Sequence, residues 1–156
     1  MQAAHARRQE IRTVSTESYD VIVVGAGNAA MCAAMSAHEN GASVVILERA
    51  PEDEAGGNSR YTAGALRFAY DGLQDIATLV DLTTKEIEEN DFGTYTTDQF
   101  FDDMFRVTQY RTDPDLCEIL VTKSLETTKW MHSKGIRFMP MYGRQAFKVD
   151  GKMKFW

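Results

Sequence analysis

The amino-acid sequence predicts an α/β protein in which a βαβ unit is followed by a helical segment and a β-hairpin. Two apolar runs, residues 21–24 and 44–47, flank an alanine-rich stretch, the pattern of two buried parallel strands joined by a helix. Apolar residues then recur at helical spacing between residues 73 and 131. Further on, Asp150-Gly151 separates two alternating stretches, which is typical of a tight hairpin.

The composition is that of a folded chain. Of its 156 residues, 44% are hydrophobic and 26% are charged, and the length suffices for one domain with a core. The net charge of −6 argues against nucleic acid or an anionic membrane as a partner. No apolar stretch approaches the ~20 residues of a transmembrane segment. Residues 1–18 carry basic side chains without a following apolar region, so we expect a flexible leader and no secretory signal.

The cysteines predict a reducing compartment. Cys32 and Cys117 are far apart and outside any Cys-x-x-Cys pattern, which favours the cytoplasm. Cys32 lies in the predicted crossover helix, where we expect a small buried side chain and not a reactive thiol. No metal site is predicted.

The turn after the first strand carries Gly25-x-Gly27-x-x-Ala30. Gly25 permits a tight turn, Gly27 lets the backbone approach a pyrophosphate, and Ala30 supplies the small residue that close helix–strand packing requires. The helix N-terminus offers N–H groups and a partial positive charge to phosphates. Glu48 lies 21 residues after Gly27, at the tip of the second strand, where its carboxylate can accept hydrogen bonds from ribose hydroxyls. These elements, in register, predict a Rossmann-like unit that binds a dinucleotide.

A glycine-rich loop follows this acid. Pro51 and an acidic run end the second strand, and the glycine pair Gly56-Gly57 opens a stretch of small and polar residues that reaches Ala65. Its place directly after the predicted ribose-binding acid suits a second loop that contacts phosphates and a ring. An ordinary surface connection is the alternative that the residues leave open.

Together these motifs resemble the N-terminal FAD-binding segment of the fumarate reductase/succinate dehydrogenase flavoprotein family. The resemblance is strong over residues 20–67 and is carried by the glycine turn, by Glu48-Arg49-Ala50 and by residues 56–64. Within the family the chain is most similar to proteins of the tricarballylate dehydrogenase type, and the resemblance continues more weakly to Trp156. It implies the N-terminal portion of a flavin-dependent dehydrogenase or reductase.

The resemblance also implies which residues bind the cofactor. The implied residues are Gly25, Gly27, Asn28, Ala29 and Ala30 at the pyrophosphate, Glu48 with Arg49 at the adenosine ribose, and Gly57, Asn58, Ser59, Thr62, Ala63 and Gly64 near the pyrophosphate and isoalloxazine. Ala65 departs from the family, which often has a second glycine there, and its methyl group would crowd the ring loop. The chain has no histidine between His38 and His132, so a histidyl link from this loop is excluded and FAD is expected to bind non-covalently.

The helical segment is expected over residues 71–135. Leu73, Ile76, Ala77 and Val80 show helical spacing, and the stretch from Leu82 to Glu86 offers a threonine N-cap with acids in the following turn. A further helix is expected over residues 97–111. The next helix is expected to begin at Asp113-Pro114 and to end near Lys134-Gly135. It is expected to bury these residues: Leu116, Ile119, Leu120, Leu125, Trp130 and Met131. The adjacent acids Asp102 and Asp103 are expected to be solvated, because neighbouring residues on a helix point in different directions.

The predicted organisation is thus a leader (1–18), a Rossmann-like FAD-binding unit with its flavin loop (19–70), a helical segment (71–135) and the truncated start of a capping or substrate domain (136–156). A short strand is expected over residues 136–139, followed by a hairpin from Ala146. We expect an incomplete domain whose missing part, or a partner chain, completes the sheet. The isolated chain should therefore bind FAD poorly or be marginally stable, since unpaired strand edges remain.

By resemblance, the full-length protein is an enzyme that transfers hydride between FAD and a small di- or tricarboxylate, with a separate electron donor or acceptor. Its catalytic residues are expected mostly beyond this chain and stay unknown. Two alternatives are open. An NAD-dependent oxidoreductase domain could use the same βαβ unit, although it would not need the loop at residues 56–65. A non-catalytic nucleotide-binding remnant or interaction module is the other.

Overall fold

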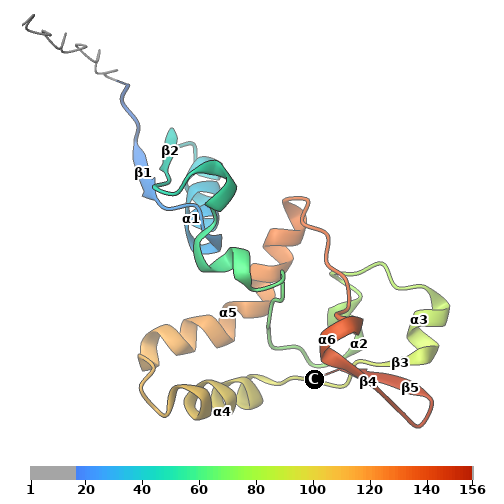
Figure 1. Cartoon of the computed structure of the whole chain (residues 1–156). Helices are drawn as coiled ribbons and strands as arrows, with labels where there is room; N and C mark the ends of the chain where they lie inside the picture. Colours follow the sequence, from blue (N-terminus) through green and yellow to red (C-terminus); the bar gives the residue numbers. More distant parts are fainter. Residues whose placement is uncertain (1–16, 156) are drawn as a thin grey trace, which may run out of the picture. The chain divides into compact units, whose positions relative to one another are not determined.

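The computed structural model describes residues 17–155 and has mixed α/β character (Figure 1). It divides into two compact units, the first ending at Gly64 and the second beginning at Ala65. Most of the expected leader, residues 1–16, and Trp156 lie outside the described residues. The two units are described separately.

The first unit contains the predicted strands and the helix between them (Figure 1). Strand β1 (Val21–Val24) leads into helix α1 (Asn28–Glu39), which leads to strand β2 (Val44–Leu47). The two strands pair in parallel, with Val21 opposite Val44. Helix α1 contacts both strands. The continuous apolar runs and the small alanines between them therefore produce the local structure that they predict.

The expected burial of these strands is wrong for most of their side chains. Val23 is buried, but Ile22 is 61% and Val24 82% exposed, and Leu47 of β2 is 51% exposed. The physical reason is that, within residues 17–155, β1 and β2 form a sheet with no other strand. Cys32 on α1 is half-buried and not fully buried as expected.

The segment after β2 is more regular than the predicted open loop. Two short 3₁₀ helices, Glu52–Glu54 and Gly57–Tyr61, are joined by a turn at Gly56. Gly56 (φ 111°) and Gly57 (φ 55°) both occupy the left-handed region. A glycine pair is favoured here because a side chain is strained in that conformation.

The second unit begins with short elements and continues with two longer helices. Its elements are α2 (Leu73–Ile76), α3 (Thr84–Glu89), β3 (Asn90–Asp91), α4 (Thr97–Thr108), α5 (Pro114–Ser133), α6 (Tyr142–Gln145), β4 (Ala146–Val149) and β5 (Lys152–Phe155). The expected threonine cap is confirmed: the cap is Thr83, which forms a capping box with Glu86. The expected start of α5 is also confirmed, because Asp113 caps it and proline occupies its first turn.

Helix α4 ends before the expected residue 111. Gln109 (φ 53°) and Tyr110 (φ 59°) adopt the left-handed conformation and stop the helix at Thr108. Its start is fixed by Thr96, which forms a capping box with Gln99.

The core of the second unit lies between α4, α5 and the segment before α2. Ala69, Phe100, Cys117 and Val121 form this core. The expected buried set of α5 is partly wrong. Leu116 (66%), Ile119 (60%) and Leu120 (48%) are exposed, and Leu125, Trp130 and Met131 are half-buried, whereas an adjacent stripe of Cys117, Val121, Ser124 and Thr128 is buried. Small side chains let α5 approach its neighbours closely, so the bulkier apolar residues are left outside.

The predicted hairpin is confirmed. Strands β4 and β5 are antiparallel with Val149 opposite Lys152, and Asp150 and Gly151 both have positive φ, as a tight two-residue hairpin turn requires. The parallel pairing of β3 with β5 was not predicted. The expected strand at residues 136–139 is wrong: this segment is irregular, and Met139, which is 79% exposed, precedes Pro140.

Candidate dinucleotide-binding site

The glycine turn ties the end of β2 to the start of α1. The backbone N–H of Gly25, which has φ +100°, donates to the carbonyl of Leu47 at 2.7 Å. Gly27 is the N-cap residue of α1 and has no side chain with which to cap the helix. The first N–H groups of a helix lack intrahelical partners and carry a partial positive charge. This turn can therefore donate hydrogen bonds to an anion.

Two segments separated in sequence meet at Gly27. A Cβ atom at this position would lie 3.4 Å from the carbonyl oxygen of Gly56 and 3.5 Å from Oγ of Ser59. The neighbouring N–H of Asn28 donates to Oγ of Ser59 at 3.0 Å. The glycine turn and the second loop thus form one surface, and a larger side chain at position 27 would fill the space before the helix.

Glu48 is held at the tip of β2 by two backbone N–H groups. Ala26 donates to Oε2 at 2.8 Å and Ala50 donates to Oε1 at 2.7 Å. The bond from Ala50 contributes most to holding the pKa of Glu48 below its usual value. The carboxylate is exposed and ionised at neutral pH. Because a carboxylate has about four acceptor positions, it can still accept ribose hydroxyls.

The rest of the second loop is braced by its own side chains. The hydroxyl of Thr62 donates to the carbonyl of Ser59 at 3.0 Å and accepts from the N–H of Gly64 at 3.3 Å. Arg60 donates to the carbonyl of Asp53. Ala63 has φ 55°, an uncommon conformation for a residue other than glycine. These bonds order the loop between the glycine pair and Gly64.

The structure brings part of the predicted set together. Gly25, Gly27, Asn28 and Ser59 share one surface, and Ala26 links Glu48 to it. The remaining predicted residues belong to the same unit: Ala29, Ala30, Arg49, Gly57, Asn58, Thr62, Ala63 and Gly64. The supporting N–H groups of Ala26 and Ala50 were not predicted. Both could have been found from the sequence, since Ala26 is the middle residue of the glycine turn and Ala50 follows Glu48 by two positions.

The donor set fits an adenine dinucleotide. N–H groups at the start of α1 suit a pyrophosphate, and the ionised Glu48 suits the two hydroxyls of a ribose. A Cβ atom at Gly27 would already contact Gly56 and Ser59, so a side chain larger than that of alanine would crowd this surface. Among residues 17–155, no three His, Cys, Asp or Glu side chains lie where they could hold a metal ion. No helix in this range is both long and apolar enough to cross a membrane.

Comparison with known proteins agrees with this chemistry. Residues 20–154 match the model of the FAD binding domain. The chain is 28% identical over 129 residues to a fumarate reductase (cytochrome) of Shewanella frigidimarina, covering 83% of this chain and 20% of that protein. It is 30% identical over 124 residues to a vinyl phenol reductase of Lactiplantibacillus plantarum, covering 78% and 21%. An NADH:fumarate oxidoreductase of Klebsiella pneumoniae is 29% identical over 134 residues, covering 86% and 13%. The chain thus spans about a fifth or less of the length of these relatives.

Proposed function

This chain belongs to the FAD binding domain family of the fumarate reductase flavoproteins, and from that membership we propose that it is the FAD-binding N-terminal part of a flavin-dependent oxidoreductase. Bound FAD supplies hydride transfer, and the protein supplies binding, orientation and electrostatics. The proposal rests on one observation: hydrogen bonds join the glycine turn to both Ser59 and the Glu48 carboxylate.

Each group has a proposed role within a Rossmann-like unit. The turn from Gly25 to Ala30 holds the pyrophosphate, through N–H groups other than those of Gly25, Ala26 and Asn28, which already donate within the protein. Glu48, with Arg49 beside it, holds the adenosine ribose. Residues 57–64 lie against the pyrophosphate and the isoalloxazine. Binding is non-covalent, because no histidine is present near this loop in the sequence. We assign no catalytic residue to this chain.

We propose a small di- or tricarboxylate, of the fumarate/succinate or tricarballylate type, as the substrate of the full-length enzyme. Support comes from relatives that are named fumarate reductases. A separate electron donor or acceptor completes the reaction.

The free thiols Cys32 and Cys117 support a cytoplasmic location.

The exposed strands support a further part of the proposal. Ile22 and Val24 of β1 are mostly exposed, and a two-stranded sheet is at best marginally stable alone. We propose that further strands complete this sheet, from a partner chain or from a longer form of the same chain. FAD binding by residues 1–156 alone should accordingly be weak.

The two alternatives make different predictions. An NAD-dependent domain would not need the second loop, yet Ser59 of that loop bonds to the start of α1. A non-catalytic module would bind nucleotide without supporting redox turnover in any longer form. The position of Ser59 therefore favours FAD over NAD. Redox turnover by a longer form is the measurement that separates the enzyme from the non-catalytic module.

Neutralising Glu48 is expected to weaken FAD binding about tenfold, because hydrogen bonds to an ionised group are worth more than those to a neutral one. The wild-type affinity should stay constant from pH 7 to about pH 5. It should fall as the pH drops through the folded-state pKa of Glu48, which lies below the usual 4.5. Flavin fluorescence titrations of wild type and Glu48→Gln across this range measure both effects.

The matched control is Asp53→Asn, which removes an exposed acid from the neighbouring 3₁₀ helix. It should leave affinity and pH profile unchanged. Equal affinities for wild type and Glu48→Gln at pH 7 would contradict the ribose-binding role.

A further inference from the structure

Helix α1 ends at an asparagine that is followed directly by a glycine. Asn40 is the C-cap residue of α1, and Gly41 has φ +86°, in the left-handed region. The sequence has four asparagines, and Asn40 is the one that precedes a glycine. A glycine offers no side chain that would hinder its backbone nitrogen from attacking the side-chain amide of the residue before it. Asn40-Gly41 is therefore the pair at which this reaction meets the least steric hindrance.

The end of α1 requires a glycine at position 41. The N–H of Gly41 donates to the carbonyl of His38 at 2.9 Å. The N–H of Ala42 donates to the carbonyl of Ala37 at 3.1 Å. These two bonds form a Schellman motif, which ends a helix with a residue in the left-handed conformation, most often glycine. The connection from α1 to β2 thus depends on the glycine that makes Asn40 chemically labile.

The Schellman motif also protects Asn40 from its neighbour. The N–H of Gly41, which must lose its proton before the nitrogen can attack, is bonded to the His38 carbonyl. Nδ2 of Asn40 is bonded as well, since it donates to the carbonyl of Ser36 at 2.8 Å. Both Asn40 and Gly41 are exposed and lie at a helix end, where local opening costs little free energy. The reaction is therefore expected from the open form of the motif.

We propose that Asn40 is a site of spontaneous deamidation, controlled by opening of the Schellman motif. In the open form the nitrogen of Gly41 bonds to Cγ of Asn40, the Cγ–Nδ2 bond breaks, and ammonia leaves with the proton of the Gly41 N–H. Water then opens the resulting cyclic imide at either of its carbonyl groups. The product is an aspartate or an isoaspartate at position 40.

Either product weakens the end of α1. The donor to the Ser36 carbonyl is lost, and the new carboxylate lies where the helix dipole places a partial negative charge. An isoaspartate also adds its β-carbon to the backbone between α1 and β2. The glycine turn lies at the other end of this 12-residue helix, about 18 Å away. The conversion is therefore expected to lower the stability of the first unit and to leave the dinucleotide-binding groups in place.

Incubation of the purified chain in neutral buffer, followed by peptide mapping with mass spectrometry, tests the site. The peptide that contains Asn40 should gain the mass difference between an amide and an acid, and should separate into two products. Asn40→Gln is the matched variant, because its amide lies one carbon further from Gly41 and closes the ring at least about tenfold more slowly. Asn90, which is 7% exposed and precedes an aspartate, should stay intact. Faster conversion at Asn90, or equal conversion of wild type and Asn40→Gln, would refute the site.

Hydrogen exchange tests the control by the Schellman motif. Conversion should be slower in the native chain than in the urea-unfolded chain, by the protection factor of the Gly41 amide within about threefold. Equal rates in the two states would refute this control, and an unchanged Asn40 peptide in urea would refute the site itself. Asn40→Asp reproduces one product, so its urea midpoint should lie below that of Asn40→Gln, and equal midpoints would refute the effect on stability. None of these measurements involves FAD, so their outcome is separate from that of the proposed function.

Discussion

Gly27→Val is expected to lower the affinity for FAD about 100-fold or more. A Cβ atom at this position already lies 3.4 Å from the Gly56 carbonyl, and the two methyl groups of valine would project into the space before α1. The phosphates would then lose two or more charge-assisted hydrogen bonds, about 3 kcal/mol in total. Flavin fluorescence titration measures the loss.

Gly27→Ala is the matched control for this substitution. Its single Cβ would lie 3.4 and 3.5 Å from Gly56 and Ser59, which is close to ordinary van der Waals contact. The affinity of this variant should therefore fall less than about tenfold. If valine and alanine had the same small effect, with far-UV circular dichroism unchanged, the pyrophosphate would not lie at Gly27.

Val121→Asp is expected to destabilise the second unit by about 4 kcal/mol or more, because an unpaired carboxylate in an apolar core is among the most costly changes in a protein. Val121 is 0% exposed and lies in the core with Phe100 and Cys117. Urea unfolding followed by circular dichroism measures the free energy of unfolding. After a loss of this size, the helical signal of α4 and α5 should be absent even without urea.

The neighbouring substitution Leu120→Asp provides the contrast. Leu120 is 48% exposed, so its replacement should cost less than about 1 kcal/mol. The pair tests which face of α5 is buried. If Leu120→Asp unfolded the second unit while Val121→Asp did not, the arrangement of α5 would be wrong.

The first unit could be predicted well because its signals are local. Strand runs, a glycine turn and an acid at fixed spacing specify β1, α1, β2 and Glu48 without reference to the rest of the chain. What could not be predicted was the burial of Ile22 and Val24. An apolar run indicates that a strand is suited to burial, but neighbouring strands decide whether it is buried.

The buried face of α5 shows a different limit. Leu116, Ile119 and Leu120 have the spacing of a core-facing stripe, yet the structure buries Cys117, Val121, Ser124 and Thr128. Both sets repeat at helical intervals, so periodicity alone cannot choose between them. The choice depends on tertiary contacts, such as the bond from the N–H of Ala69 to Oγ of Ser124 at 2.9 Å.

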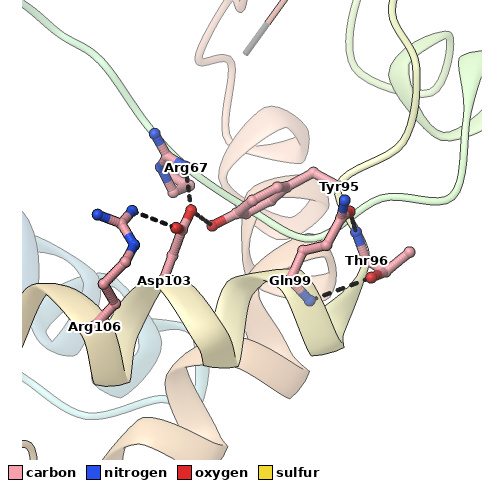
Figure 2. Close-up of polar contacts among 6 residues, drawn as sticks. All are labelled: Arg67, Tyr95, Thr96, Gln99, Asp103 and Arg106. Atoms are coloured by element: carbon pink, nitrogen blue, oxygen red, sulfur yellow. Dashed lines mark hydrogen bonds and ion pairs between the residues drawn. The ribbon is translucent and has the colours of Figure 1, made fainter. Parts of the chain in front are cut away.

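The pairing of Asp103 with two arginines, Arg67 and Arg106, also depends on tertiary contacts (Figure 2). Asp103 is therefore not the solvated side chain that the sequence predicted. Arg67 and Tyr95 reach Asp103 from outside α4, so only its pairing with Arg106, three residues further along the helix, was visible in the sequence. By contrast, the caps at Thr83 and Asp113 involve residues three positions away and could be predicted. Local pairs are visible in a single sequence, whereas contacts across the fold are not.

The proposed FAD site is tested most directly by an equilibrium titration of the purified chain with FAD, with NAD⁺ as the competitor. Weak but saturable binding of one FAD per chain is expected. NAD⁺ should displace FAD only at concentrations about tenfold higher or more, because residues 57–64 are proposed to contact the flavin half. Binding of NAD⁺ as tight as that of FAD, or no saturable FAD binding by a folded chain, would contradict the proposed site.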